Sequence, residues 1–479
     1  MSPRFFTSFF HHPDKTFGLF SLIALLMLLL SSGIPFFWDN IALSEVANYY
    51  YDTSFRHLIP PADSDFGAFT LEAFYLSAVW SLLGHTLPVS HMAMAPFLVG
   101  ILWEVRKISL RVVRPGYLPL IYLLLLADPA LATQTLLMGY DVFMLYFVLL
   151  SVRLLWEKKP LWYALSLLLL SAVSVRGIIF VVCLFLTQGF ITLFIDKTKL
   201  RFREMWVYLP ALVFVLVWSV FHYVSTGWWL MNPVNVSHRS ANGFTMLLRQ
   251  LGYVIWKLID SGRIALWIFC GWGLWMLAKR RIWTVELKKF LLFLALPLLL
   301  QTGLMIFISN PIGHKYFLQT FLFLSIMAVV LLQEFSSAGK RLLLTFSLLL
   351  MLLAGNFIMY PQKYGNAWDT SLKVLPFFRA ERQMKDFVVT NHIPPAEVFT
   401  AFPLTANRRF SYLTEDFAYS ELQPGRLDSC HYLLCSNLLN VADLSPWREA
   451  ETHWTPLFRV EIGQVYLGLY RRPGGNTGK

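Results

Sequence analysis

The chain has 479 residues, of which 57% are hydrophobic and 14% are charged, and its mean hydropathy is +0.56. These values exclude an ordinary soluble globular protein and indicate a polytopic membrane protein. The formal net charge of +12 does not indicate nucleic-acid binding, because the basic residues come in short clusters between apolar runs and not on one soluble face.

Eleven apolar runs are long enough to cross a bilayer, if flanking residues complete the two short ones. They lie at about 17–38, 87–104, 117–127, 136–154, 161–175, 177–195, 206–225, 262–278, 290–308, 315–333 and 341–360. Arg4 and Lys15 precede the first run as in a signal peptide, but no small-x-small cleavage site follows. We therefore interpret this run as a retained first span.

The basic residues predict which side of the membrane each loop faces. With eleven spans, six basic clusters fall on one side, which the positive-inside rule makes cytoplasmic. The clusters are Arg4/Lys15, Arg106/Lys107/Arg111/Arg114, Arg153/Lys158/Lys159, Lys197/Lys199/Arg201/Arg203, Lys279/Arg280/Arg281/Lys288/Lys289 and Lys340/Arg341. This assignment requires that Ala68–Leu83 does not cross, so we expect a juxtamembrane helix there, within a first outer loop at 39–86.

Residues 361–479 have no long apolar run and follow the last span on the outer side. The alternating stretch "RVEIGQVYLGLYRR" predicts strands, and "RAERQMKDFVVTNH" predicts a helix. The fold class is therefore an α-helical polytopic membrane protein of about 11 transmembrane helices, with outer juxtamembrane helices and a small C-terminal soluble α/β domain.

Four cysteines occur in the chain. Cys183 and Cys270 lie in apolar runs, where a thiol behaves as a small hydrophobe. Cys430 and Cys435 lie in the polar C-terminal part, where they form either a disulfide, if that part faces an oxidising compartment, or two buried free thiols.

The first outer loop carries several acidic residues. Asp39 follows Phe36, Phe37 and Trp38, aromatic residues that would anchor it at the interface, and Glu45 lies further along the same stretch. Asp39 is a candidate general base held at a fixed height, or else a plain loop carboxylate.

Asp63 and Asp65 stand at the entrance to the interfacial helix. There they either cap that helix or help to hold an acceptor or a cation.

A charged residue at membrane level is costly without a partner, so such a residue indicates a functional site. Asp141 and Arg176 lie in apolar surroundings near the outer ends of spans. Either the two form an ion pair with each other, or Arg176 binds a phosphate group. His314 and Lys315, followed by Tyr316, start another span from outside. They either snorkel to the interface or hold the phosphate of a lipid head group.

Motifs of other chemistries are absent. The sequence has no G-x-x-x-x-G-K-[ST], no G-x-G-x-x-G after a strand, no H-E-x-x-H and no C-x-x-C pair. A nucleotide-dependent enzyme and a zinc protein are therefore poorly supported.

Five stretches carry a family resemblance by their order and spacing. They are "WDNIALSEVANYYY", "DSDFGAFTLEAFYLSAVWSLLGHTLPVSHMAMAPFLVGILWEV", "LLLLADPALATQTLLMGYDVFMLYFVLL", "SVRGIIFVV" and "GHKYFLQTFLFLSIMAVVLL". In this order, over about residues 17–335, the chain resembles the GT-C superfamily of integral-membrane glycosyltransferases, especially the branch of protein O-mannosyltransferases and bacterial aminoarabinose transferases. Two positions depart from the family pattern: Asn40 replaces the second acid after the first span, and Asp65-Phe66-Gly67-Ala68 replaces a His-Pro-Pro element.

The resemblance implies that residues 1–360 form a transmembrane catalytic domain that uses a polyprenyl-phosphate-linked sugar on the outer side. A single inverting displacement would transfer the sugar to a hydroxyl of a protein, lipid or glycan. In this scheme Asp39 is the catalytic residue, helped by Asp63 or Asp65. The lipid phosphate would be bound by Arg176, His314, Lys315 and Tyr316. Asp141 and Glu45 would have supporting roles.

No cofactor is required by this scheme, although a carboxylate cluster could hold a divalent cation, as in the oligosaccharyltransferase branch. The expected location is the plasma or bacterial inner membrane, among membrane lipids and without nucleic acid. The N-terminus would be cytoplasmic, and the active site and the 361–479 domain extracytoplasmic. By analogy only, that domain would cover the site and help to select the acceptor.

Two other functions stay open. A transporter or flippase would use Asp141 and Arg176 as a coupling pair, but we find no repeated half and no paired spans broken by Gly or Pro. A catalytically impaired scaffold would work through its C-terminal domain, and the missing second acid at Asn40 favours this slightly.

Overall fold

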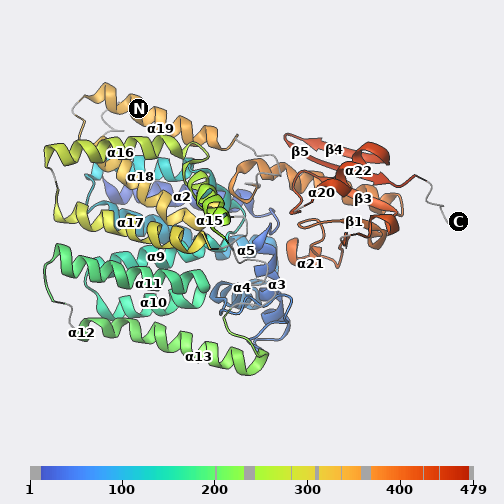
Figure 1. The fold of residues 1–479 in the computed structure, drawn as a ribbon, viewed down its shortest axis with the longest axis horizontal. Helices are drawn as coiled ribbons and strands as arrows, with labels where there is room; N and C mark the ends of the chain where they lie inside the picture. The colour runs from blue at the N-terminus through green and yellow to red at the C-terminus, as the bar shows by residue number, and fades with distance from the viewer. Residues whose placement is uncertain are drawn as a thin grey trace.

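The computed structural model describes residues 12–199, 202–230, 243–281, 283–307, 312–335, 337–357, 368–423, 425–441 and 443–473. Arg4, Arg201 and the expected domain boundary at residue 360 lie outside these ranges. A bundle of helices forms the larger part of the molecule, and a small α/β part lies at one end of it (Figure 1). This arrangement matches the expected fold class.

Each apolar run that the sequence indicates contains a helix within its described residues. In chain order they are α2 (Pro13–Ser31), α3 (Asp39–Asp52), α4 (Leu71–Leu83), α5 (Leu87–Ala93), α6 (Ala95–Ser109), α7 (Leu118–Ala127), α8 (Pro129–Leu136), α9 (Tyr140–Trp156), α10 (Pro160–Val173), α11 (Val175–Phe190), α12 (Phe202–Met205), α13 (Leu209–Thr226), α15 (Phe244–Ile259), α16 (Arg263–Arg280), α17 (Val285–Met305), α18 (Leu318–Leu332) and α19 (Ala338–Gly355). Within the described ranges, seven helical stretches are long and apolar enough to cross a membrane, or up to nine if each of two bent pairs is one span. The remaining two predicted runs correspond to α9, of 17 residues, and α10, of 14 residues. The chain is a multi-pass helical membrane protein.

Helix α18 is the centre of the bundle. Every residue of Leu318–Leu332 is buried, and the helix packs against α7, α9, α16 and α17. A helix that is apolar all round is stable only when other helices surround it or lipid does. The short 3₁₀ segment η4 (His314–Phe317) leads directly into α18, so its side chains start from a fixed position.

Ion pairs join neighbouring basic clusters of the sequence. Arg111 at the end of α6 pairs with Glu157 at the end of α9 over 3.5 Å, and Lys289 at the start of α17 pairs with Asp196 over 2.9 Å. The first contact brings the basic clusters of 106–114 and 153–159 to the same end of the bundle, and the second does so for those of 197–203 and 279–289. The predicted topology requires this arrangement. The cytoplasmic identity of this end stays a prediction.

The opposite end of the bundle carries the segment expected to lie along the interface. Helix α4 packs against α3 and α5, and all three lie at the end of the bundle that faces the α/β part (Figure 1). The first outer loop therefore adjoins both the bundle and the C-terminal part.

Two helices are sharply broken, and one ion pair joins the breaks. Helices α7 and α8 meet at 70°, and α15 and α16 meet at 88°. Asp128 caps α8 by accepting hydrogen bonds from the amides of Ala130 and Leu131. The same carboxylate accepts two 2.7 Å hydrogen bonds from the guanidinium of Arg263, which begins α16 and lies 3.8 Å from the ring centre of Phe321. Both charged side chains are fully buried, so each supplies the partner that the other needs.

The C-terminal part is a small α/β unit, as predicted. Its five described strands form one mixed sheet in the order β2-β1-β3-β5-β4. The strands are β1 (Val398–Thr400), β2 (Ser420–Glu421), β3 (Tyr432–Ser436), β4 (Thr455–Ile462) and β5 (Val465–Arg471); the helices are α20 (Leu375–Thr390), α21 (Arg408–Ser411) and α22 (Ser445–His453). β1 pairs in parallel with β2 and β3, whereas β5 pairs antiparallel with β3 and β4. Cys430 and Cys435 are buried free thiols, so the disulfide alternative is wrong in this structure.

The C-terminal part docks on the start of α3. The ring of Phe37 lies 5.4 Å from that of Phe377 and 5.7 Å from that of Phe378, both on α20. Arg409 on α21 forms a 2.5 Å ion pair with Asp52 at the end of α3. These contacts fix α3 between the bundle and the sheet.

We expect Arg263→Met to lower the free energy of unfolding by about 3–5 kcal/mol, because it leaves the buried Asp128 carboxylate without its counter-charge. Unfolding followed in detergent by circular dichroism measures this loss. Arg459→Met is the matched control, since it removes a pair with Glu461 in which both side chains are more than half exposed, and surface pairs contribute only about 0–1 kcal/mol. Equal unfolding midpoints for the two variants would contradict the prediction.

Candidate functional site

The ammonium of Lys315 joins three distant segments of the chain. Its Nζ lies 2.6 Å from Oδ2 of Asp39, the first residue of α3, and 2.7 Å from Oδ2 of Asp369. Asp369 belongs to η6 (Trp368–Thr370), which precedes α20. The Lys315 side chain is only 4% exposed, whereas that of Asp39 is 40% exposed. The Asp39 carboxylate is therefore the member of this group that a substrate can reach.

Arg176 forms the second cationic centre. From the start of α11 it donates hydrogen bonds to the Asp141 carboxylate and the Tyr140 hydroxyl, both at the start of α9. Its guanidinium lies 4.9 Å from the ring centre of Tyr140 and 4.3 Å from that of Tyr316. The Asp141–Arg176 ion pair, one of the two alternatives from the sequence, is present.

Tyr140 brings the two cationic centres together. Its ring centre is 5.9 Å from Nζ of Lys315 and 4.9 Å from the guanidinium carbon of Arg176. Cations interact favourably with the face of an aromatic ring at such distances. Lys315, Arg176, Asp39, Asp141 and Asp369 with the two tyrosines thus form one connected group, which we call the Lys315 cluster.

His314 faces a different set of partners from its neighbour Lys315. Its Nε2 lies 2.6 Å from Oδ2 of Asp260, at the break between α15 and α16. Its Nδ1 lies 3.1 Å from the Thr370 hydroxyl. Because both ring nitrogens have protein partners, this histidine ties the broken helix to η6, and its predicted contact with a lipid phosphate stays a prediction.

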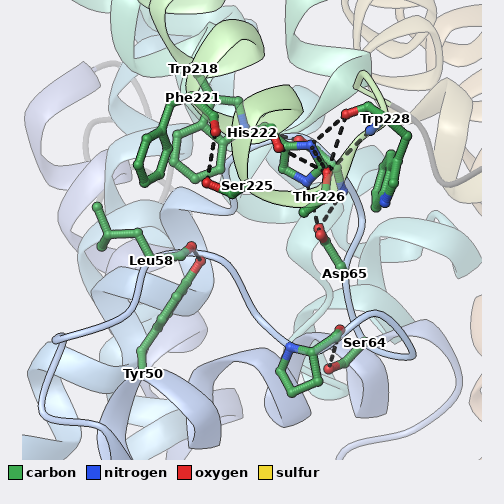
Figure 2. Close-up of polar contacts among 12 residues, drawn as sticks. Tyr50, Leu58, Ser64, Asp65, Trp218, Phe221, His222, Ser225, Thr226 and Trp228 are labelled. Carbon is green, nitrogen blue, oxygen red and sulfur yellow. Dashed lines mark hydrogen bonds and ion pairs between the residues drawn. The ribbon is translucent and has the colours of Figure 1, made fainter.

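Asp65 lies in a buried contact between the first outer loop and α13. Oδ2 of Asp65 is 2.9 Å from Nε2 of His222, and Oδ1 accepts a 2.7 Å hydrogen bond from the amide of Gly67. Nδ1 of His222 is 3.0 Å from the carbonyl oxygen of Trp228, just after α13 (Figure 2). The arrangement holds the end of α13 to the loop, which is a positioning role; a part for Asp65 in catalysis stays a prediction.

Gly67 is required by the close approach of these two segments. Its φ is +83°, and a Cβ atom there would lie 2.5 Å from the carbonyl oxygen of Leu230. A side chain at this position would therefore separate the loop from the segment that follows α13.

Asp63 and Glu45 form a second acidic pair outside the Lys315 cluster. Asp63 is exposed, and Glu45 is half-buried on α3. Burial, and to a lesser degree the charge of Asp63, raise the pKa of the Glu45 carboxyl. No group of three or more His, Cys, Asp or Glu residues is arranged to hold a metal ion among the described residues.

Several residues of the site were missed at the level of sequence. Lys257 and Asp260, in "VIWKLIDSGR", interrupt an apolar stretch and could have been noticed by that signal. Asp369 has no such signal, because it lies in an ordinary polar stretch. Glu72, on α4, is 3% exposed and its Oε2 has no hydrogen-bond partner within the described part of the chain.

We expect His222→Ala to loosen the loop around Asp65, because it removes the partner of a buried carboxylate. Hydrogen exchange of the Gly67 amide, followed by mass spectrometry, should quicken about tenfold, which corresponds to about 1.4 kcal/mol. Ser225→Ala is the control, since this exposed serine, in the part of the chain that the structure describes, bonds within α13 to the carbonyl oxygen of Phe221 (Figure 2). Unchanged protection in His222→Ala would contradict the positioning role.

Comparisons with known proteins identify the fold. No protein-family model and no curated protein sequence matches the chain. The crystal structure of ArnT from Cupriavidus metallidurans bound to undecaprenyl phosphate matches at 12% identity with a TM-score of 0.58, over 95% of this chain and 98% of that one. The apo ArnT structure matches at 13% identity (TM-score 0.48; 94% and 97% of the chains), and the cryo-EM structure of the arabinofuranosyltransferase AftD from Mycobacteria at 10% (TM-score 0.41; 95% and 39%). Through this likeness, the chain has the fold of the undecaprenyl-phosphate-bound ArnT structure.

Proposed function

We propose that the chain is a glycosyltransferase that moves a sugar from a polyprenyl-phosphate-linked donor to an acceptor hydroxyl. One observation carries this proposal: an accessible carboxylate, Asp39, is bound to Lys315 beside Arg176, at one end of a bundle with a GT-C fold. The ArnT structure of that fold contains undecaprenyl phosphate, so the fold accommodates a lipid phosphate. A base and two cations are the groups that such a reaction needs.

Asp39 is the proposed general base. The acceptor oxygen attacks the anomeric carbon of the sugar, its proton passes to the Asp39 carboxylate, and the bond from that carbon to the phosphate oxygen breaks with its electrons on the phosphate. One displacement of this kind inverts the anomeric configuration, because the attacking and leaving oxygens lie on opposite faces of the sugar. With 40% of its side chain exposed, Asp39 is open to the incoming hydroxyl.

Arg176 and Lys315 are the proposed partners of the departing phosphate. Fixed cations in a site of low dielectric constant stabilise the charge that develops on a leaving group. The guanidinium of Arg176 is already oriented by Asp141, by the Tyr140 hydroxyl and by the rings of Tyr140 and Tyr316. Little reorganisation is then needed when the phosphate charge appears. The scheme uses no metal ion.

The reaction is proposed to occur on the outer face of the membrane. The basic clusters support a cytoplasmic location for the opposite helix ends, by the positive-inside rule. The Lys315 cluster lies at the end of the bundle that adjoins the C-terminal part, through Asp39 on α3 and Asp369 on η6. The C-terminal part is thus positioned to contact a protein, lipid or glycan acceptor near Asp39.

We expect Asp39→Asn to reduce the rate of sugar transfer about 10²–10⁴-fold, because an amide cannot take the proton from the hydroxyl of the acceptor. The purified protein in lipid would be given a mixed pool of polyprenyl-phosphate sugars, and released polyprenyl phosphate would be measured. Asp52→Asn is the control: Asp52 ends the same helix and pairs with Arg409, away from the Lys315 cluster. If wild-type protein binds or translocates these donors without releasing the phosphate, the transferase is excluded and a transporter or scaffold is favoured.

We expect Arg176→Gln to reduce kcat about 10²–10³-fold, the loss typical for one donor to a developing negative charge. Since this change leaves Asp141 buried without its partner, the double variant Arg176→Gln/Asp141→Asn separates folding from catalysis. The double variant should regain thermal stability without regaining turnover. Recovery of turnover in the double variant would assign Arg176 a structural role only.

A further inference from the structure

Asp369 is a buried carboxylate that the proposed mechanism does not use. Its side chain is 10% exposed, and its Oδ2 lies 2.7 Å from Nζ of Lys315. Its carbonyl oxygen accepts a 2.6 Å hydrogen bond from the side-chain amide of Gln134 on α8. The next residue, Thr370, contacts His314. The backbone of η6 is therefore fixed to the bundle independently of the Asp369 carboxylate.

The charges of the Lys315 cluster do not balance for a phosphate. Asp39 and Asp369 both contact the single ammonium of Lys315, and Arg176 is paired with Asp141. Among the described members of the cluster, three carboxylates thus accompany two cations. The buried ammonium of Lys257, beside the cluster, also acts on Asp369, but it is shared with the Asp260 carboxylate, so the excess of one carboxylate remains. An incoming phosphate adds at least one negative charge, and like charges a few ångströms apart repel strongly where water is largely excluded. One carboxylate must therefore move away from its cation if the phosphate of the donor is to bind tightly.

Asp369 is the carboxylate that can leave Lys315 when a phosphate binds, and Asn40 does not take part in this exchange. Asn40 stands where the family pattern has a second acid, but its side chain is buried and donates a 3.0 Å hydrogen bond to the carbonyl oxygen of Leu137. It points into the packing of the bundle and not to Lys315. Asp39 has to stay near the acceptor as the base, so Asp369 is the carboxylate that can leave Lys315.

We propose that Asp369 is a positioning residue that holds Lys315 in the donor-free protein and yields this place to the phosphate of the donor. The inference rests on the proposed function, since it takes the ligand to be a polyprenyl phosphate. Asp369 thereby keeps the buried ammonium paired and oriented before the donor arrives. Since η6 leads into α20, the same exchange connects occupation of the donor site with the start of the C-terminal part.

The test is direct binding of undecaprenyl phosphate to the full chain in lipid nanodiscs, without sugar or acceptor. We expect Asp369→Asn to bind it about tenfold more tightly than wild type, because the variant loses the competing charge but keeps the carbonyl that Gln134 contacts. Asp428→Asn is the control, since this 94% exposed carboxylate pairs with Arg472 in the C-terminal part, and it should not change the affinity. Equal or weaker binding by Asp369→Asn would overturn the inference.

A second variant tests whether the effect passes through Lys315. In a Lys315→Gln background, Asp369→Asn should no longer change the affinity, because the shared partner is gone. A full tenfold gain in that background would contradict the exchange. Undecaprenol, which lacks the phosphate, should bind all variants equally, and a gain for undecaprenol would also contradict it.

The outcomes separate this inference from the proposed function. If wild-type protein transfers sugar and binds undecaprenyl phosphate, but Asp369→Asn has the same affinity, only the role of Asp369 fails. If neither wild type nor Asp369→Asn binds the lipid phosphate, the donor site itself fails, and both proposals fall with it.

Discussion

The architecture around the site depends on keeping one ammonium charge out of water. Lys315 is 4% exposed, and a buried cation is tolerated only when carboxylates lie against it. One of these, Asp39, comes 276 residues earlier in the chain, and the other, Asp369, comes after the last helix of the bundle. The first outer loop, the start of α18 and the C-terminal part must therefore meet at one point. The docking of α20 on Phe37 and the contact of Thr370 with His314 maintain this meeting.

The same requirement recurs wherever the bundle contains charge. Asp128 and Arg263 join the breaks of two bent helices, and Asp141 and Arg176 join the starts of α9 and α11. In each case a side chain that would be costly alone defines which helix ends are neighbours. Buried ion pairs contribute little net stability compared with apolar packing, so their value here is in fixing geometry. That geometry is what the proposed phosphate-binding site needs.

Much of the fold could be predicted, because spans and strands follow from local hydrophobic patterns. The apolar runs became helices, and the stretch containing Val460 and Leu467 became paired strands. Asp39, Arg176 and Lys315 could be singled out, since a charge at the edge of an apolar run is visible locally. Their partners were only partly predictable: Asp141 stood out by the same rule, but Asp369 did not. Asp65 shows the limit most clearly, since nothing near it in the sequence indicates a partner 157 residues away.

The central place of α18 has a consequence for how the protein is made. Four of its neighbours, α7, α9, α16 and α17, precede it in the chain, α19 follows it, and synthesis delivers the N-terminal segments first. The earlier helices must therefore remain in the bilayer without their common core until residues 318–332 emerge. Assembly of the bundle and delivery of the Lys315 ammonium to its carboxylates are thus late and nearly simultaneous events. A nascent chain halted before residue 314 would contain most of the spans and Arg176, but neither the core helix nor Lys315.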